Sequence, residues 1–559
     1  MAPFTRRQRV GNALKFLELL RREVTFRPLP FIILAALSGF ANAAVLATIN
    51  AAAQNVTARQ GNLRFILLFG LAIAIFVVCQ RRLMSEICAK VEDAIHGVRV
   101  RLLDLARRSE LLQIEEIGRS EIYACLSRET QTLAQAAPSM VIVVQSAILV
   151  ACTLLYIATL SGLAFALAVV FTVLGGLIHR MQMSEINRQL RDTYTRETEL
   201  ADRLSDLLDG FKEVKMNTAR GLELGEQGRA ISAEVARLKT RTQILYARDF
   251  VMSQVTFFIL TGVMVFVVPN LSSAYLDVVV KTTTASLFMI GPISNVVGGI
   301  PIFSNANAAA QHILELEARM VALERSVTES PPPFRHFEQI RAEGITYRYR
   351  GPQGEAGFQI GPIDLTLRRG TIVFITGGNG SGKTSMLLTL LGLYPPQSGR
   401  LMLDDVVIGP HNLNAYRNLF SAVFADSHLF RELYGVETID AALAADLFGL
   451  LEMSGKTELK GKSFGTTKLS GGQRKRLALI AALLEKRPIC FFDEWAADQD
   501  PYFREKFYRV ILPRLKKDGI TVIAITHDDK YFDVADVHLH MDEGRMTILR
   551  APEDRAVGA

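Results

Sequence analysis

The sequence predicts a chain of two domains: an all-α membrane domain of six helices, then an α/β domain that carries a phosphate-binding loop. Long apolar runs are confined to the first 305 of 559 residues. A glycine-rich motif lies near residue 380, between an apolar strand and a helix. A chain of this length suggests more than one domain. We expect the membrane domain over 1–325, a proline-rich linker over 326–334, and the second domain over 335–559.

Six apolar runs approach or reach the length of about 20 residues that a helix needs to cross a bilayer. Apolar residues make up 49% of the chain. Six such runs favour a multi-pass membrane protein over a soluble helical core. The expected spans are Pro30–Ala52, Leu63–Cys79, Ser139–Thr159, Leu163–Ile178, Phe250–Val268 and Thr284–Phe303.

Basic residues flank these spans on one side. Seven of them lie between Arg6 and Arg27, before the first span, and others follow the second and fourth spans at Arg81, Arg82 and Arg180. The positive-inside rule then places both termini in the cytoplasm. Apolar residues among the basic ones around Phe16 predict a helix that lies on the inner surface. The net charge of +7 needs no nucleic-acid partner, since much of it flanks apolar spans.

Two long polar segments, 81–138 and 179–249, lie on that cytoplasmic side. They are rich in Leu, Glu, Arg and Ala, so we expect helices. An arm of about 25 residues would project about 40 Å from the membrane. Ordinary soluble helical hairpins remain an alternative for both segments.

The stretch 377–384 fits the phosphate-loop pattern G-x-x-x-x-G-K-[ST]. An apolar strand precedes it and a helix follows, so backbone N–H groups and the helix N-terminus would surround a phosphate. Lys383 would reach the β- and γ-phosphates and Thr384 would bind Mg²⁺. The expected nucleotide contacts in this stretch are Gly377, Asn379, Gly380, Ser381, Gly382, Lys383 and Thr384.

Three further segments follow along the chain, at 469–473, at 493–494 and at His527. Their joint occurrence in this order supports an ATPase. Asp493 and Glu494 end an apolar strand, where Asp493 would hold Mg²⁺ and Glu494 would orient or deprotonate the attacking water. His527 follows another apolar run and would face the γ-phosphate. A surface turn, a pair of acids at a strand end and a satisfied histidine are the structural alternatives. The first of the three segments along the chain is Leu469-Ser470-Gly471-Gly472-Gln473.

On these residues the second half resembles the nucleotide-binding domain of an ABC transporter, with Leu469 to Gln473 as the signature sequence. The resemblance implies that Tyr349 stacks on adenine, although an edge-strand aromatic is the alternative. It also implies that two such domains sandwich two ATP molecules, so that Ser470, Gly471, Gly472 and Gln473 of one copy complete the site of the other. The expected cofactors are therefore ATP and Mg²⁺, and the expected partner is a second copy of this chain.

The six spans and the polar arms resemble the membrane half of a six-helix ABC exporter. The resemblance implies transverse coupling helices at the arm tips, around Ile114–Ala124 and Gly210–Asn217, although a plain turn is equally consistent with the sequence. The family usually has a glutamine after the strand that ends near Phe424, where this chain has Ala425-Asp426. Asp426 is the candidate replacement, as a polar contact to Mg²⁺, and a solvated loop acid is the alternative.

The sequences around Asp426 and Asp493 resemble those of bacterial exporters of cyclic peptides and peptide siderophores. No Asp, Glu, Lys or Arg lies centrally in a span, so we expect a nearly neutral pathway with amides such as Gln145 and Asn295. Such amides also serve to join helices. The leading hypothesis is export of a peptide-like substrate across the bacterial inner membrane by a homodimer. The alternatives are an importer of a siderophore or small peptide, and a regulatory ATPase without transport.

Overall fold

The computed structural model describes residues 15–23, 28–56, 63–271, 278–323, 334, 336–350, 356–426 and 428–551. The chain divides into two compact units. The first comprises 1–107 and 118–319, and the second comprises 108–117 and 320–559. The predicted linker, 326–334, lies outside the described residues except for Phe334.

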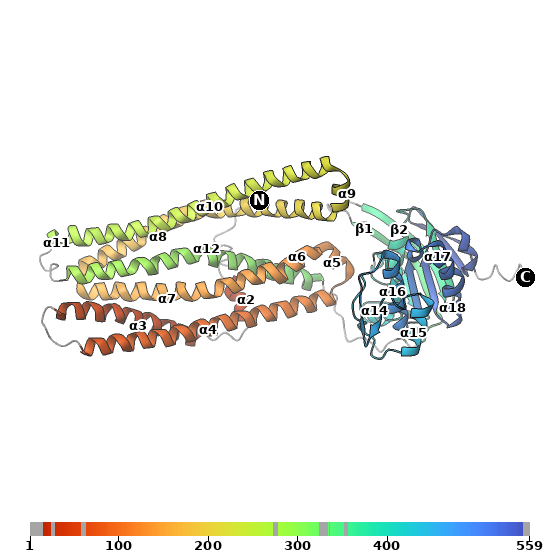
Figure 1. Ribbon diagram of the computed structural model, residues 1–559, viewed down its shortest axis with the longest axis horizontal. Coiled ribbons are helices and arrows are strands. Elements are labelled where there is room, and N and C mark those ends of the chain that lie inside the picture. The colour runs from red at the N-terminus through yellow and green to blue at the C-terminus, as the bar shows by residue number, and fades with distance from the viewer. Residues whose placement is uncertain are drawn as a thin grey trace, which may run out of the picture. The chain divides into compact units, whose positions relative to one another are not determined.

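The first unit is all-α and is built from long helices that run roughly along one direction (Figure 1). α8 and α10 pack against each other, as do α3 and α7. The helices are α2 (Lys15–Glu23), α3 (Pro28–Val56), α4 (Leu63–Arg108), α6 (Arg119–Ala124), a π-turn at Cys125–Glu129, α7 (Thr130–Leu160), α8 (Gly162–Asp209), α9 (Phe211–Met216), α10 (Thr218–Phe266), α11 (Val268–Leu271) and α12 (Val279–Leu323).

In the part of the chain that the structure describes, six helical segments are long and apolar enough to span a membrane, and each contains one of the six predicted spans. The polar arms continue the same helices without a break, so that α4 has 46 residues and α8 has 48. A tight turn at Ser161 joins α7 to α8, and the Ser161 side chain caps α8 by accepting from the N–H of Ala164. The expected helical arms are therefore confirmed.

Two of the amides expected near a pathway join helices instead. Gln145 of α7 donates to the Ser38 hydroxyl of α3 at 3.1 Å, and Asn295 of α12 donates to Ser146 of α7 at 3.3 Å. A Cβ added at Gly299 would lie 2.0 Å from a methyl carbon of Val143, which shows how closely α12 approaches α7. These residues contribute to helix packing.

The predicted surface helix before the first span is α2, and its apolar face is buried against other helices of the unit. Phe16 is fully buried and meets Phe303 edge-on at 6.4 Å. Arg101 of α4 pairs with Glu23 at 2.5 Å and with Glu317 of α12 at 2.6 Å. These contacts fix α2 to α4 and α12.

At the first position where a coupling helix is expected, the helix is shorter and begins earlier than the predicted Ile114–Ala124. α5 spans Leu111–Ile117, and Gly118 then interrupts the helix with φ of 87°, a backbone conformation that glycine adopts readily. The residues from Arg119 onward begin α6. The second predicted position, Gly210–Asn217, contains the short helix α9.

The second unit contains a six-stranded sheet in the order β12-β11-β3-β10-β9-β6, in which all neighbours are parallel except β11 and β12. A four-stranded antiparallel sheet has the order β2-β1-β4-β5. The strands are β1 (Gln339–Arg350), β2 (Ala356–Arg368), β3 (Ile372–Gly377), β4 (Ser398–Leu403), β5 (Val406–Val407), β6 (Phe420–Val423), β7 (Leu459–Lys460), β8 (Ser463–Phe464), β9 (Ile489–Asp493), β10 (Thr521–Ile525), β11 (Val537–Asp542) and β12 (Arg545–Arg550).

Two apolar clusters hold this unit together on either face of the parallel sheet. One lies between the two sheets and includes α13 (Lys383–Leu390), with Phe491 and Leu539 as buried members. The other packs helices on the opposite face around Trp495 and Phe507, which stack at 4.4 Å. The helices of the unit, with α5, are α13, α14 (Leu413–Arg417), α15 (Ala441–Leu450), α16 (Gly471–Leu484), α17 (Pro501–Lys506), the π-turn Phe507–Ile511, α18 (Leu512–Lys517) and two 3₁₀ turns, Trp495–Asp498 and Asp529–Val534. The α/β class predicted for the second half is confirmed.

Candidate functional site

The phosphate loop connects the carboxyl end of β3 to the N-terminus of α13, as its sequence predicts. Gly377, Gly380 and Gly382 have φ of 141°, 77° and 100°. A Cβ at Gly377 would lie 2.1 Å from the carbonyl oxygen of Met541, and one at Gly382 would lie 2.7 Å from Ile360. Only glycine fits these positions without displacing neighbours, so the tight loop follows directly from the motif.

Polar groups in this loop suit a bound polyphosphate. The Lys383 ammonium donates to the carbonyl groups of Gly377 and Gly378, both at 2.8 Å, and burial lowers the pKa of Lys383. The buried Ser381 hydroxyl has no hydrogen-bond partner. A buried hydroxyl without a hydrogen-bond partner destabilises the fold, and a phosphate oxygen would accept from both this hydroxyl and the N–H groups of the helix N-terminus. The loop therefore fits a nucleoside triphosphate.

Asp493 ends β9 and is buried, whereas Glu494 immediately after it is partly exposed. Burial and the neighbouring Glu494 raise the pKa of Asp493, and the N–H of Ala425 opposes this by donating to its carboxylate. Glu494 has φ of 46°, a strained conformation for a non-glycine residue. The next residue, Trp495, anchors this turn by donating from its indole to the carbonyl of Lys475 at 2.8 Å.

His527 lies beside Glu494, with 3.2 Å between its Nε2 and the Glu494 carboxylate. The residues on either side are held firmly, because the Tyr508 hydroxyl contacts both Thr526, at 2.5 Å, and Asp528, at 2.9 Å. β9 and β10 pair in parallel, which brings the ends of the two strands together. The two predicted catalytic residues are therefore neighbours.

Tyr349 lies near the phosphate loop and is partly buried in a cluster of tyrosines. Its hydroxyl is 2.9 Å from Ser385, the residue after Thr384. Its ring meets Tyr347 and Tyr394 edge-on at 5.2 and 6.0 Å. This position is consistent with a contact to a nucleotide base, and stacking on adenine stays a prediction.

The signature residues form the N-terminus of a different helix. Ser470 caps α16 in a reciprocal box with Gln473, whose N–H donates to Ser470 Oγ. The hydrogen bonds found for this stretch in the described residues lead to Gln499, which donates to the carbonyl of Gly472 at 3.2 Å, and not to the phosphate loop. The chain therefore does not place its signature in its own phosphate site, as expected where a second copy completes the site.

The altered loop after β6 contacts the acidic strand through its backbone. The N–H of Ala425 donates to Asp493. The carboxylate of Asp426 is exposed, yet it lies close enough to contribute to the raised pKa of Asp493. Asp426 is therefore near the predicted magnesium ligand, and its role there remains a prediction.

Helix α5 belongs to the second unit and contacts it through charged and aromatic groups that sequence reasoning missed. Arg417 of α14 pairs with Glu110, and the Tyr394 hydroxyl donates to Glu115 at 3.0 Å. Tyr394 in turn stacks on Tyr347 at 4.9 Å. A second missed contact is that of Lys475, whose ammonium donates to the carbonyl of Glu494 at 3.1 Å and pairs with Asp498 at 2.8 Å. Only the tertiary fold brings these residues together.

The first unit contains a cavity of about 1370 Å³ between α7, α8, α10 and α12, named the polar cavity for the charged side chains among its apolar ones. Its lining combines both signs of charge with hydroxyl and amide groups, and the buried hydroxyl of Tyr246 has no hydrogen-bond partner. The expectation of a nearly neutral pathway is incomplete, because charged residues of the helical arms also line this space. The charged lining residues are Arg128, Glu129, Glu197, Lys239 and Asp249.

Comparison with known proteins finds relatives that cover residues of both halves of the chain. The family model described as ABC transporter matches residues 360–497. The ATP-binding protein SyrD of Pseudomonas syringae pv. syringae is 33% identical over 404 residues, which are 70% of this chain and 71% of that protein. An ATP-dependent lipid A-core flippase of Bordetella avium (strain 197N) is 26% identical over 411 residues, 70% of this chain and 68% of that protein. The structure of a bacterial Atm1-family ABC exporter with ATP bound superposes with a TM-score of 0.76, at 17% identity, over 96% of this chain and 97% of that one.

Proposed function

This chain belongs to the ABC transporter family, and from that premise we propose that it exports a peptide-like amphiphile across the bacterial inner membrane as a homodimer. ATP binding and hydrolysis coupled to transport follow from the family. The direction, the class of substrate and the assembly are the proposed parts. The exporter fold of the superposed structure supports the direction.

In the proposed site the phosphate loop binds ATP. Backbone N–H groups of Gly377 to Gly382 and the N-terminus of α13 surround the phosphates. Lys383 exchanges its two carbonyl partners for the β- and γ-phosphates. Tyr349 meets the base, and Ser470 to Gln473 of the second copy close the site from the other side. Thr384 and Asp493, with Asp426 nearby, would hold Mg²⁺, which when bound neutralises charge on the phosphate oxygens.

Hydrolysis requires a water molecule in line with the γ-phosphate. Glu494 accepts a proton from that water, or orients it, because its partly exposed carboxylate projects from a strained turn at the end of β9, which only β10 separates from the phosphate-loop strand β3. His527 lies 3.2 Å from this carboxylate and would contact the γ-phosphate. Lys475 supports the turn through the carbonyl of Glu494. Catalysis then consists of positioning and charge stabilisation.

The observation that carries the proposed substrate class is the polar cavity of about 1370 Å³. Cations and anions line it together, as in the Lys239–Glu197 pair, so a peptide with both charge signs can exchange these partners for its own groups. Tyr246 also lines the cavity, and its buried hydroxyl has no hydrogen-bond partner among the described residues. A small inorganic ion would not require a cavity of this size or such varied groups.

A homodimer is proposed because each copy carries every residue type that a complete site needs. Lys383, Asp493, Glu494 and His527 are present on one side, and Ser470 is present on the other. The basic residues before the first span support cytoplasmic termini. The ATPase half would then face the cellular pool of ATP.

Transport into inverted membrane vesicles tests the direction. Vesicles containing the chain should accumulate a dansyl-labelled amphiphilic cyclic peptide with one lysine and one glutamate when ATP is added outside. Vesicles containing the Glu494→Gln protein should not accumulate it. Accumulation only in right-side-out vesicles would assign import, and intact ATP hydrolysis without transport in either orientation would contradict the proposal.

A further inference from the structure

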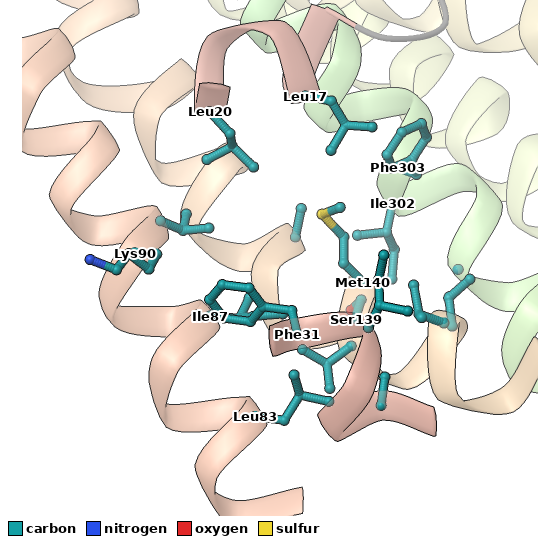
Figure 2. Close-up of a pocket in the computed structure, with 18 of the residues that line it drawn as sticks. Leu17, Leu20, Phe31, Leu83, Ile87, Lys90, Ser139, Met140, Ile302 and Phe303 are labelled. Carbon is teal, nitrogen blue, oxygen red and sulfur yellow. The ribbon is translucent and has the colours of Figure 1, made fainter. Parts of the chain in front are cut away.

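A second cavity, of about 480 Å³, lies in the first unit between α2, α3, α4, α7 and α12. Figure 2 shows Leu17 and Leu20 of α2 on one side, Leu83 and Ile87 of α4 on another, and Phe303 of α12 opposite. The cavity is separate from the polar one, although Ile302 of α12 lines both. α12 therefore contributes to the walls of both cavities.

The lining is apolar except for Ser139 and Lys90. Apolar cavities exclude water and accept apolar ligands, because water would find no hydrogen-bond partners inside. The volume lies within the range of ordinary ligand sites, about 300–1,000 Å³. A hydrocarbon chain matches these walls, whereas a polar substrate does not.

The cavity runs along α4 and α7, where the second span has ended and the third begins. Along α4 it extends from Leu83 to Val91, and along α7 from Ala136 to Val144. Eight residues of helix correspond to about 12 Å. In the proposed orientation Val91 and Ala136 lie at the cytoplasmic end, whereas Leu83, close to the end of the second span, and Val144, within the third span, lie nearer the membrane. An acyl chain in this cavity would point the way that a lipid of the cytoplasmic leaflet points.

Among the described residues, Lys90 is the only charged group of the lining, and it lies at that cytoplasmic end. The aliphatic stem of Lys90 borders the cavity and its ammonium points away from it (Figure 2). The Lys90 side chain is about half exposed, and its ammonium has an ion-pair contact of 3.8 Å with Asp93, too long for a strong hydrogen bond. A negative head group outside the cavity would therefore find a cation beside its own chain.

We propose that this cavity binds one acyl chain of an anionic membrane phospholipid, whose head group lies at Lys90. The bound chain packs Leu17 and Leu20 of α2 against α12 and fills the space behind the wall of the polar cavity. This site is additional to the proposed transport function. Only the choice of leaflet depends on the orientation proposed above, so lipid binding and export can fail separately.

Native mass spectrometry of the full-length protein tests the site. The protein is purified from membranes that contain phosphatidylglycerol and phosphatidylethanolamine, and the retained lipids are identified. Val91→Phe places a ring in the cavity and should cause loss of the retained phospholipid. Val100→Phe makes the same change at an exposed position of the same helix that does not line the cavity, and it should retain lipid like the parent. Equal retention by both variants would overturn the site.

A charge reversal tests the head group and does not depend on a buried substitution. Lys90→Glu should shift the retained lipid from phosphatidylglycerol to phosphatidylethanolamine, while Arg82→Glu, exposed on the same helix and outside the cavity, should keep the parent pattern. Unchanged phosphatidylglycerol in the Lys90→Glu protein would overturn the assignment. If the parent protein retains no phospholipid but binds a palmitoylated peptide that Val91→Phe excludes, the chain belongs to the cargo and the phospholipid proposal is wrong.

Discussion

At the residue scale, the ATPase chemistry depends on how the fold holds a few polar groups close together. Glu494 occupies a left-handed conformation at the end of β9 and lies beside His527 at the end of β10. Lys383 has only backbone carbonyl groups as hydrogen-bond partners. Each group is thus placed near a phosphate site and can exchange its present contacts for a substrate.

Glu494→Gln should still bind ATP but hydrolyse it about 100-fold more slowly or worse, because the attacking water loses its base. Lys383→Ala should instead weaken nucleotide binding. ATP binding and phosphate release measured on the same preparations separate the two effects. Hydrolysis by the Glu494→Gln protein at the parent rate would refute the assigned role.

Asp493 gives a pH-dependent prediction. Burial and Glu494 raise its pKa above the ordinary value, so the ionised form destabilises the folded protein at neutral pH. Asp493→Asn should therefore raise the Tm of the nucleotide-free protein at neutral pH. The gain should shrink as the pH falls through the raised pKa, because the parent carboxyl is then neutral as well.

Thermal unfolding with Mg²⁺ and ATP supplies the control for this variant. Added Mg²⁺ and ATP should stabilise the parent protein strongly at neutral pH and the Asp493→Asn protein much less, since the amide is a poor ligand for Mg²⁺. A Tm gain that does not depend on pH would show that the carboxylate charge is not its cause.

At the scale of elements, a row of contacts within the second unit leads from α5 to the start of α13. Glu115 of α5 accepts from Tyr394, which stacks on Tyr347 and meets Tyr349 edge-on, and Tyr349 contacts Ser385 at the start of α13. These groups form a physically continuous connection. The usual glutamine is absent from the loop after β6, so this tyrosine cluster is a candidate for part of the coupling.

Tyr394→Phe keeps the ring contacts but removes the hydrogen bond to Glu115. The variant should reduce substrate-stimulated ATP hydrolysis by more than it reduces the basal rate, because contact with α5 is weakened while the phosphate loop is intact. Tyr416→Phe is a matched control, since the Tyr416 hydroxyl donates only to the carbonyl of Leu390 within the domain. Equal losses in the two rates would mean that Tyr394 has only a structural role.

Asp426 gives a separate test of coupling through the altered loop. Asp426→Ala should also lower the stimulated rate more than the basal rate, because the carboxylate lies near Asp493. Asp518→Ala, at an exposed helix end of the same unit, controls for loss of a surface charge. If both rates of the Asp426→Ala protein equal those of the parent in lipid, Asp426 is a solvated loop acid.

The elements that could be predicted are those specified by local sequence. Apolar length predicts the six spans, and the glycine pattern predicts the phosphate loop, because each depends on neighbouring residues. The prediction of one helix over Ile114–Ala124 was wrong, because the conformation of Gly118 ends α5 within an otherwise helical pattern. Tyr394, Lys475 and Lys239 were not predicted, since no local pattern tells which distant segment each will contact.

At the scale of the whole molecule, the chain carries the two halves of an ATP site at separate places. The phosphate loop and acidic strand are at one place, and the signature begins a helix whose contacts lead to Gln499 instead. Two copies would complete two equivalent sites. In the proposed homodimer the polar cavity between α7, α8, α10 and α12 would supply the transport route.

Reconstitution of the purified chain alone tests this account most directly. In proteoliposomes with the ATPase units outside, ATP and Mg²⁺ should drive accumulation of the dansyl-labelled cyclic peptide inside, and a cross-linked dimer should be recovered from the same vesicles. The Glu494→Gln protein should show the dimer without accumulation. Accumulation that requires a second, different chain, or ATP hydrolysis by a stable monomer without uptake of the peptide, would contradict export by a homodimer.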